Sequence, residues 1–159
     1  MAEEICALAG DTKLETPEGA LTVKSMAAKP VSIFTWEKGR ARFRMARDIR
    51  LVAEQQPVLR ITLADGASFR VGPAQVLYKK GMVEARAGEL QSGDELVPTF
   101  HYPEGYQFRD DRQDGATATS IAAIRVAAVE PGGEADIYSL AINVSGCFFL
   151  SAGVLAKSL

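Results

Sequence analysis

The chain has 159 residues, of which 47% are hydrophobic and 24% are charged, and its formal net charge is −2 at neutral pH. This length is enough to bury one sizeable core, so we expect a single domain over residues 1–159. The composition excludes a disordered or fibrous protein. The small negative charge gives no general attraction to nucleic acid or to an anionic membrane, and neither is expected as a partner.

The start of the chain and its cysteines indicate the compartment. The opening Met-Ala-Glu-Glu-Ile lacks the basic region and apolar run of a signal peptide, and no apolar run reaches the roughly eighteen residues of a membrane span. We therefore expect a cytoplasmic protein. Cys6 and Cys147 lie near opposite ends and cannot alone form a disulfide framework or a four-ligand metal site. Two thiols, and no metal or other cofactor, are expected.

Short segments of alternating apolar residues in the first half predict β-hairpins. Residues 12–16 and 21–23 flank the turn sequence Pro-Glu-Gly, and residues 31–36 and 40–45 flank Glu-Lys-Gly. Proline presets φ and glycine accepts positive φ, which suits both residues to turns. Further along, residues 59–63 alternate before an Asp-Gly pair, a strong hairpin signal.

The second half continues the same pattern. Residues 76–79 and 82–84 flank Lys-Gly, and strands are expected at 138–142, 147–150 and 154–156. Pro131-Gly132-Gly133 is interpreted as a turn, and the alanines within 121–129 leave a helix possible there. The pattern as a whole predicts an all-β fold of many short strands.

Residues 98–120 interrupt this pattern with a polar stretch that contains the single histidine, His101. Such a segment offers little apolar area to offset its ordering entropy. We expect a long, mobile surface loop or an insertion site.

Four segments, taken in order, are similar to the sequence blocks of inteins and other Hint domains. They are residues 7–12 with 14–19, residues 58–66 with 69–78, residues 81–85 with 89–96, and residues 137–156. The resemblance implies a horseshoe-like fold of hairpins whose two chain ends lie together. It also implies a relation to protein splicing and autocatalytic cleavage. The loop at 98–120 falls where many inteins carry an endonuclease, so this resembles a minimal form.

The resemblance implies a first step in which a Cys or Ser at the start of the domain attacks the preceding carbonyl. A Thr and a His three residues apart then supply a hydrogen bond and a proton. The matching positions here are Gly72 and Gln75. Glycine has no hydroxyl, and glutamine does not titrate near neutral pH. The resemblance therefore places no acid catalyst at this site.

The nucleophile is also displaced. Aligning Gly10 with the family places Ala7 at the first position, and alanine cannot attack a carbonyl. Cys6 could serve if the backbone absorbed one extra residue, for example in a bulge. The alternative, which we favour, is that Cys6 is a buried thiol.

At the C-terminal end the family shows His-Asn before a Ser, Thr or Cys, and the Asn cyclises to cut the chain. This sequence ends in Lys157-Ser158-Leu159. Serine has no carboxamide to cyclise, and a one-residue slip that makes Ser158 the downstream nucleophile places Lys157 in the Asn position. Complete splicing is therefore not expected.

These observations lead to two functional hypotheses. The first is a splicing-deficient Hint-like domain that retains at most thioester-type cleavage at its N-terminal end and acts only on its own flanking polypeptide. The alternative is an all-β protein-interaction module without self-processing, because a fold does not fix a function. Five arginines between Arg40 and Arg50 are interpreted as a solvated strand face rather than an RNA contact.

Overall fold

The computed structural model describes residues 6–27, 29–37, 40–98, 107–109, 117–119, 123–142 and 146–159. Every described element is a strand or a short 3-10 helix, which confirms the all-β prediction. The strands are β1 (Leu8–Ala9), β2 (Lys13–Thr16), β3 (Gly19–Thr22), β4 (Val31–Glu37), β5 (Arg40–Leu63), β6 (Ser68–Val71), β7 (Val76–Lys79), β8 (Val83–Arg86), β9 (Glu95–Leu96), β10 (Gln107–Arg109), β11 (Thr117–Thr119), β12 (Ile124–Ile142), β13 (Cys147–Phe149) and β14 (Leu155–Lys157). The helices are η1 (Val23–Met26) and η2 (Ala87–Glu89).

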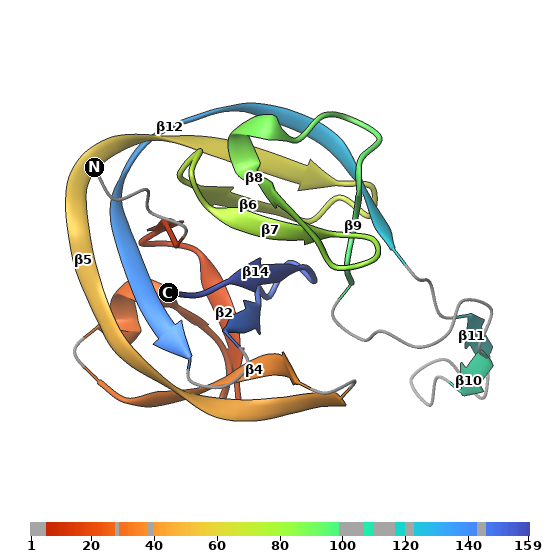
Figure 1. The fold of residues 1–159 in the computed structure, drawn as a ribbon, viewed down its shortest axis with the longest axis horizontal. Helices are drawn as coiled ribbons and strands as arrows, with labels where there is room; N and C mark the ends of the chain where they lie inside the picture. Colours follow the sequence, from red (N-terminus) through yellow and green to blue (C-terminus); the bar gives the residue numbers. More distant parts are fainter. Residues whose placement is uncertain are drawn as a thin grey trace.

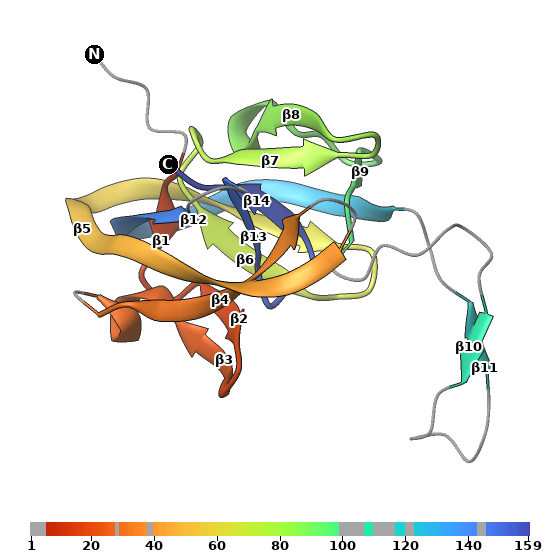
Figure 2. The same cartoon turned by 60° about the horizontal axis from the view of Figure 1, so that its bottom comes forward.

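Two long strands, β5 and β12, form the frame of the molecule. They span 24 and 19 residues and pair antiparallel along most of their length. Repeated register shifts along this pair bend it into a curved ribbon around the other strands (Figure 1). In the second view, β7 and β8 lie on one side of this ribbon and β2 and β3 on the other (Figure 2). The sequence pattern of many short strands did not indicate the length of these two elements.

The turn expected at Pro131-Gly132-Gly133 is also wrong, because β12 continues through these residues. A Cβ on Gly132 would lie 3.0 Å from the backbone nitrogen of Arg60, so glycine allows close approach of β12 to β5. Gly133 has φ +81°, and the register shifts between Pro131 and Glu134. The same residues that favour a turn here make a bulge within a strand. The helix possible at 121–129 is excluded over its described part from Ile124 onward, which is strand.

The predicted hairpins are confirmed. β2 pairs with β3, β4 with β5, β5 with β6, and β7 with β8, all antiparallel. The turn between β5 and β6 contains Gly66 at φ +91°, and the turn between β7 and β8 contains Gly81 at φ +86°. Both glycines adopt the left-handed conformation that other residues rarely accept.

The segment 98–120 holds one feature that its polar sequence did not predict. β10 and β11 pair with each other, in register from Gln107↔Thr119 to Arg109↔Thr117, and with no other described strand. Pro98 bridges to Val154 at the start of the segment. The remaining residues of the segment, His101 included, lie outside the described residues, and so does the prediction of mobility.

The main core brings the two ends of the described chain into the centre of the molecule. Leu8 in β1 lies between β12 and β6, while Ala156 in β14 pairs with Leu77 in β7. Leu8, Leu77 and Ala156 are all fully buried. Leu8 and Ala156 belong to one core cluster, and the Gln75 side chain bonds to both Ala7 and Lys157, so the expectation that the chain ends lie together is confirmed for the described residues. Within those residues no helix is both long and apolar enough to cross a membrane.

Candidate functional site

The buried side chain of Gln75 connects the two ends of the described chain. Its Oε1 accepts a hydrogen bond from the Ala7 N–H at 2.7 Å, and its Nε2 donates to the Lys157 carbonyl at 3.0 Å and to the Val76 carbonyl at 2.9 Å. Each partner has only one role to offer, an N–H donor or a carbonyl acceptor, so the network itself fixes the orientation of the amide. One carboxamide therefore satisfies the backbone of both ends.

The loop between β6 and β7 holds Gln75 in place. Gly72 donates its N–H to the Ala7 carbonyl at 2.8 Å, and the Gln75 N–H returns to the Gly72 carbonyl at 3.0 Å. The Ala87 N–H, at the start of η2, bonds to the Gln75 carbonyl at 2.8 Å. These backbone bonds fix the loop against the N-terminal end on one side and against η2 on the other. These backbone hydrogen bonds alone fix the place of Gln75 in the loop.

Gly72 and Ala7 are in direct contact. A Cβ built on Gly72 would lie 2.9 Å from the Ala7 Cβ and 3.5 Å from the Ala7 carbonyl oxygen. Two carbon atoms cannot approach so closely without displacement of one of them. Gly72 therefore packs so tightly against Ala7 that a threonine side chain would not fit at this position.

Cys6 and Ala7 belong to different buried clusters. The fully buried Cys6 side chain packs in the main core with Leu8, whereas Ala7 packs with Ala9 and Val58. This alternation is ordinary for extended chain. Ala7 therefore lies against Gly72 and bonds through its N–H to Gln75, while the Cys6 side chain packs in the main core.

At the C-terminal end both candidate side chains bond to other partners. Ser158 is 1% exposed, and its Oγ accepts from the Ile142 N–H at 3.3 Å and donates to the Leu159 carbonyl at 3.2 Å. The Lys157 ammonium forms an ion pair with Glu84 at 2.8 Å. Only the backbone of Lys157 reaches Gln75.

The fold of this chain is similar to that of solved structures, whereas its sequence matches no known family. No protein-family model matches this chain, and no curated protein matches its sequence. Solved structures match it over nearly its whole length. The DnaB intein from Synechocystis sp. PCC 6803 superposes with a TM-score of 0.72 at 10% identity, covering 96% of this chain and 98% of the intein.

Two further structures agree. The bacterial intein-like domain from Clostridium thermocellum matches with a TM-score of 0.73 at 14% identity, covering 98% of this chain and 100% of that domain. The DnaX mini-intein from Spirulina platensis gives 0.69 at 12% identity, with 96% and 99% coverage. This chain has the Hint fold. At such low identity the likeness concerns the fold and not the chemistry.

The second thiol of this Hint fold lies in a smaller cluster beside the C-terminal strands. The Cys147 thiol donates a hydrogen bond to the Trp36 carbonyl at 3.2 Å. The Cys147 carbonyl accepts a hydrogen bond from the Thr35 hydroxyl. Burial raises the pKa of the neighbouring Tyr78 to about 12, with smaller contributions from Cys147 and Glu84. The phenol stays protonated at neutral pH and cannot serve as a base. Cys147 is a core residue here.

Sequence reasoning missed the partners that bind the C-terminal side chains in this Hint fold. Glu84 lies 73 residues from Lys157, and the Ile142 N–H that bonds Ser158 lies 16 residues away. An exposed glutamate and a backbone N–H carry no sequence signal that would assign them to these partners. Among the described residues, no group of three or more His, Cys, Asp or Glu side chains is placed to share a metal ion.

Proposed function

We propose that this chain is a Hint-fold domain that holds its two flanking polypeptide ends together without splicing them. Any self-cleavage is limited to the N-terminal end, and the only polypeptide on which the domain acts is its own. The observation that carries this proposal is the Gln75 amide, which bonds to the backbone of Ala7 and of Lys157. The fold brings the ends together. At the positions that match the family's nucleophile, its Thr and His and its Asn, this chain has other residues.

Cleavage of the Cys6–Ala7 peptide bond needs a nucleophile and a proton for the leaving nitrogen. The side chain of Ala7 offers no nucleophile. Gln75 accepts the Ala7 N–H instead of delivering a proton to that nitrogen, and its carboxamide does not titrate near neutral pH. The contact thus stabilises the intact peptide bond.

Cys6 is the remaining nucleophile at this end. Its Sγ would attack the carbonyl carbon of the preceding residue and form a thioester as the C–N bond breaks and the Cys6 nitrogen takes up a proton. The Cys6 side chain is completely buried in the main core, so the thiol must leave this packing before it can react. We expect this reaction to be slow or absent.

The test is thiol-dependent release of a folded reporter protein fused upstream of the domain, followed by intact mass. The parent should release none. The variant Ala7→Cys/Gln75→His restores a nucleophile and a proton donor while Gly72 is kept. It should release reporter about 10² to 10⁴ times faster than Ala7→Cys alone, the usual contribution of a positioned acid. Cleavage without ligation is the expected product.

One result would revise the expected rate of cleavage, and another would contradict the proposal. Release by the parent that is lost in Cys6→Ser would show that Cys6 is an active nucleophile and that N-terminal cleavage is not slow. Ligated flanking segments from the parent would show that splicing occurs without the expected groups. A triple variant that adds Gly72→Thr serves as a control for the packing at Ala7, and we expect it to fold poorly because of the contact at 2.9 Å.

A further inference from the structure

Among the described residues, one edge of β5 has no partner strand over the middle section of β5. β4 pairs with this edge up to Ala46, and β6 pairs with it again from Leu59. Between these residues β12 occupies only the opposite edge, and no described strand or described backbone group bonds to the free one. In an antiparallel strand alternate residues direct their N–H and C=O groups to each edge. Backbone donors and acceptors are therefore available along residues 47–54, before Gln55, whose N–H bonds to the Asp136 carboxylate, and Pro57, which has no N–H.

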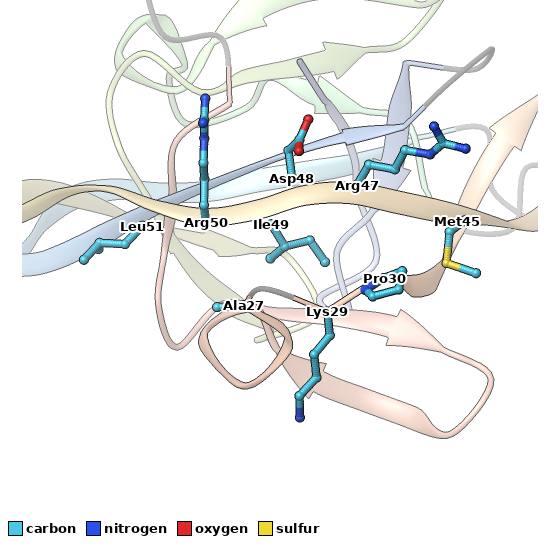
Figure 3. A pocket seen from close by; sticks show the side chains of 9 residues that line it. All are labelled: Ala27, Lys29, Pro30, Met45, Arg47, Asp48, Ile49, Arg50 and Leu51. Atoms are coloured by element: carbon cyan, nitrogen blue, oxygen red, sulfur yellow. The ribbon is translucent and has the colours of Figure 1, made fainter.

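An open cavity lies next to the start of this free edge. It has a volume of about 670 Å³ and lies between residues 47–51 of β5 and the connection from η1 to β4. Ala27, Pro30 and Ile49 line it with apolar groups (Figure 3). Met45 and Leu51, which also line it, are 47% and 42% exposed, so apolar surface continues beside the cavity.

A bulge separates the charged side chains from the apolar ones. The register opposite β12 advances from Arg50↔Ser139 to Arg47↔Ala141, so β5 has one extra residue, and Asp48 adopts φ +54°. A bulge of this kind breaks the alternation of side chains. Arg47, Asp48 and Arg50 consequently project from one side of β5, while Ile49 and Leu51 project from the other (Figure 3).

We propose that this edge binds an extended peptide as an additional strand, and that the peptide carries alternating apolar and acidic side chains. Strand addition supplies main-chain hydrogen bonds, and alternate side chains then face opposite sides of the sheet. Apolar side chains on one side enter the cavity beside Ile49. Acidic side chains on the other side face Arg47 and Arg50, whose two positive charges exceed the single negative charge of Asp48. Pairing of residues 47–51 with the same residues of a second copy would oppose two segments that each have one excess positive charge, which disfavours a second copy as the occupant.

The test uses the full chain, labelled with ¹⁵N, and the blocked peptide acetyl-Glu-Val-Glu-Leu-Glu-Val-amide as the probe. Titration should shift the amide resonances of residues 45–51 while those of Ala7 and Gln75 stay unchanged. The same peptide with lysine in place of glutamate should bind at least about tenfold more weakly, because close opposite charges at an interface favour association and like charges oppose it. Arg47→Glu/Arg50→Glu should lower affinity for the acidic peptide and raise it for the basic one. Arg60→Glu, on the same strand away from the cavity, should leave both unchanged.

Two N-methylated versions of the acidic peptide test the strand geometry. N-methylation of alternate residues removes the N–H groups of one edge while keeping every side chain, and it should abolish binding in one of the two methylation registers. Equal binding of both methylated peptides would exclude strand addition. Equal binding of the acidic and basic peptides, or no shifts at millimolar peptide, would overturn the proposal. Self-association of the free chain through residues 45–51, seen by sedimentation, would assign the edge to a second copy and overturn the choice of occupant. None of these outcomes depends on whether the chain ends are cleaved.

Discussion

The two ends of the chain meet at the same amide group but are held in different ways. At the N-terminal end only the backbone of Ala7 contacts Gln75, and its methyl group packs against Gly72. At the C-terminal end the side chains of Lys157 and Ser158 make their own bonds in addition to the backbone contact. Proximity of the ends is thus a property of the scaffold and requires no reactive side chain. The following experiments test that difference.

The largest effect is expected from the residue that both ends share. Gln75→Leu gives an apolar side chain of similar volume but removes the amide that bonds to the Ala7 N–H and to the Lys157 and Val76 carbonyls. Each buried unsatisfied group costs about 1–3 kcal/mol, so we expect a loss of about 3–4 kcal/mol in the free energy of unfolding, measured with urea. Gln91→Leu, at an exposed position, is the control and should change stability by less than about 0.5 kcal/mol. A loss below about 1 kcal/mol for Gln75→Leu would show that the two ends do not depend on this amide.

The contact at the N-terminal end predicts a coupled pair. Gly72→Ala should cost about 1–3 kcal/mol, because its new methyl group meets Ala7. Ala7→Gly removes the other side of the contact, so the double variant should recover part of that loss. A double-mutant cycle on unfolding free energies measures the coupling. Strict additivity would mean that the cost at Gly72 arises from the backbone and not from Ala7.

At the C-terminal end the hydroxyl should contribute more than the charge. Ser158→Ala leaves the buried Ile142 N–H without its acceptor and should cost about 1–2 kcal/mol. Lys157→Met removes an ion pair whose side chains are 31% and 50% exposed, and should cost less than about 0.5 kcal/mol. Thermal unfolding of both variants gives the comparison. If Lys157→Met proves the more costly, the ion pair with Glu84 is what holds this end.

The hairpins and the adjacency of the ends could be predicted from the sequence because their signals are local or shared with a family. Gly66 and Gly81 mark their turns through a backbone conformation that few other residues adopt. The length of β5 could not be predicted, because Asp48 and Gln55, both at positive φ, interrupt the alternation by which a strand is recognised.

The site itself was predictable only in part. The resemblance placed Ala7 and Gln75 at one centre, and the structure brings them into contact, while their catalytic roles remain a prediction. The packing of Ala7 against Gly72 and the pairing of Lys157 with Glu84 are contacts between distant parts of the chain. Neither leaves a pattern in the sequence, because contacts between segments far apart in the chain depend on how the strands pair.

The smallest effect concerns the cluster beside the C-terminal strands and appears only at high pH. Tyr78 has its pKa raised to about 12 in the folded chain, against about 10 in the unfolded chain. Between these values the unfolded chain loses a proton that the folded chain keeps, so stability is fully present below pH 10 and falls as the pH rises toward 12. Tyr78→Phe removes this dependence. The free energy of unfolding of the parent should therefore fall between pH 9 and pH 11 by up to about 1 kcal/mol more than that of Tyr78→Phe. Tyr138→Phe is the matched control, since it keeps Tyr78 and should follow the parent. Parallel curves for the parent and Tyr78→Phe would show that the phenol is as well solvated as in the unfolded chain, and that this end of the molecule is more open than its burial implies.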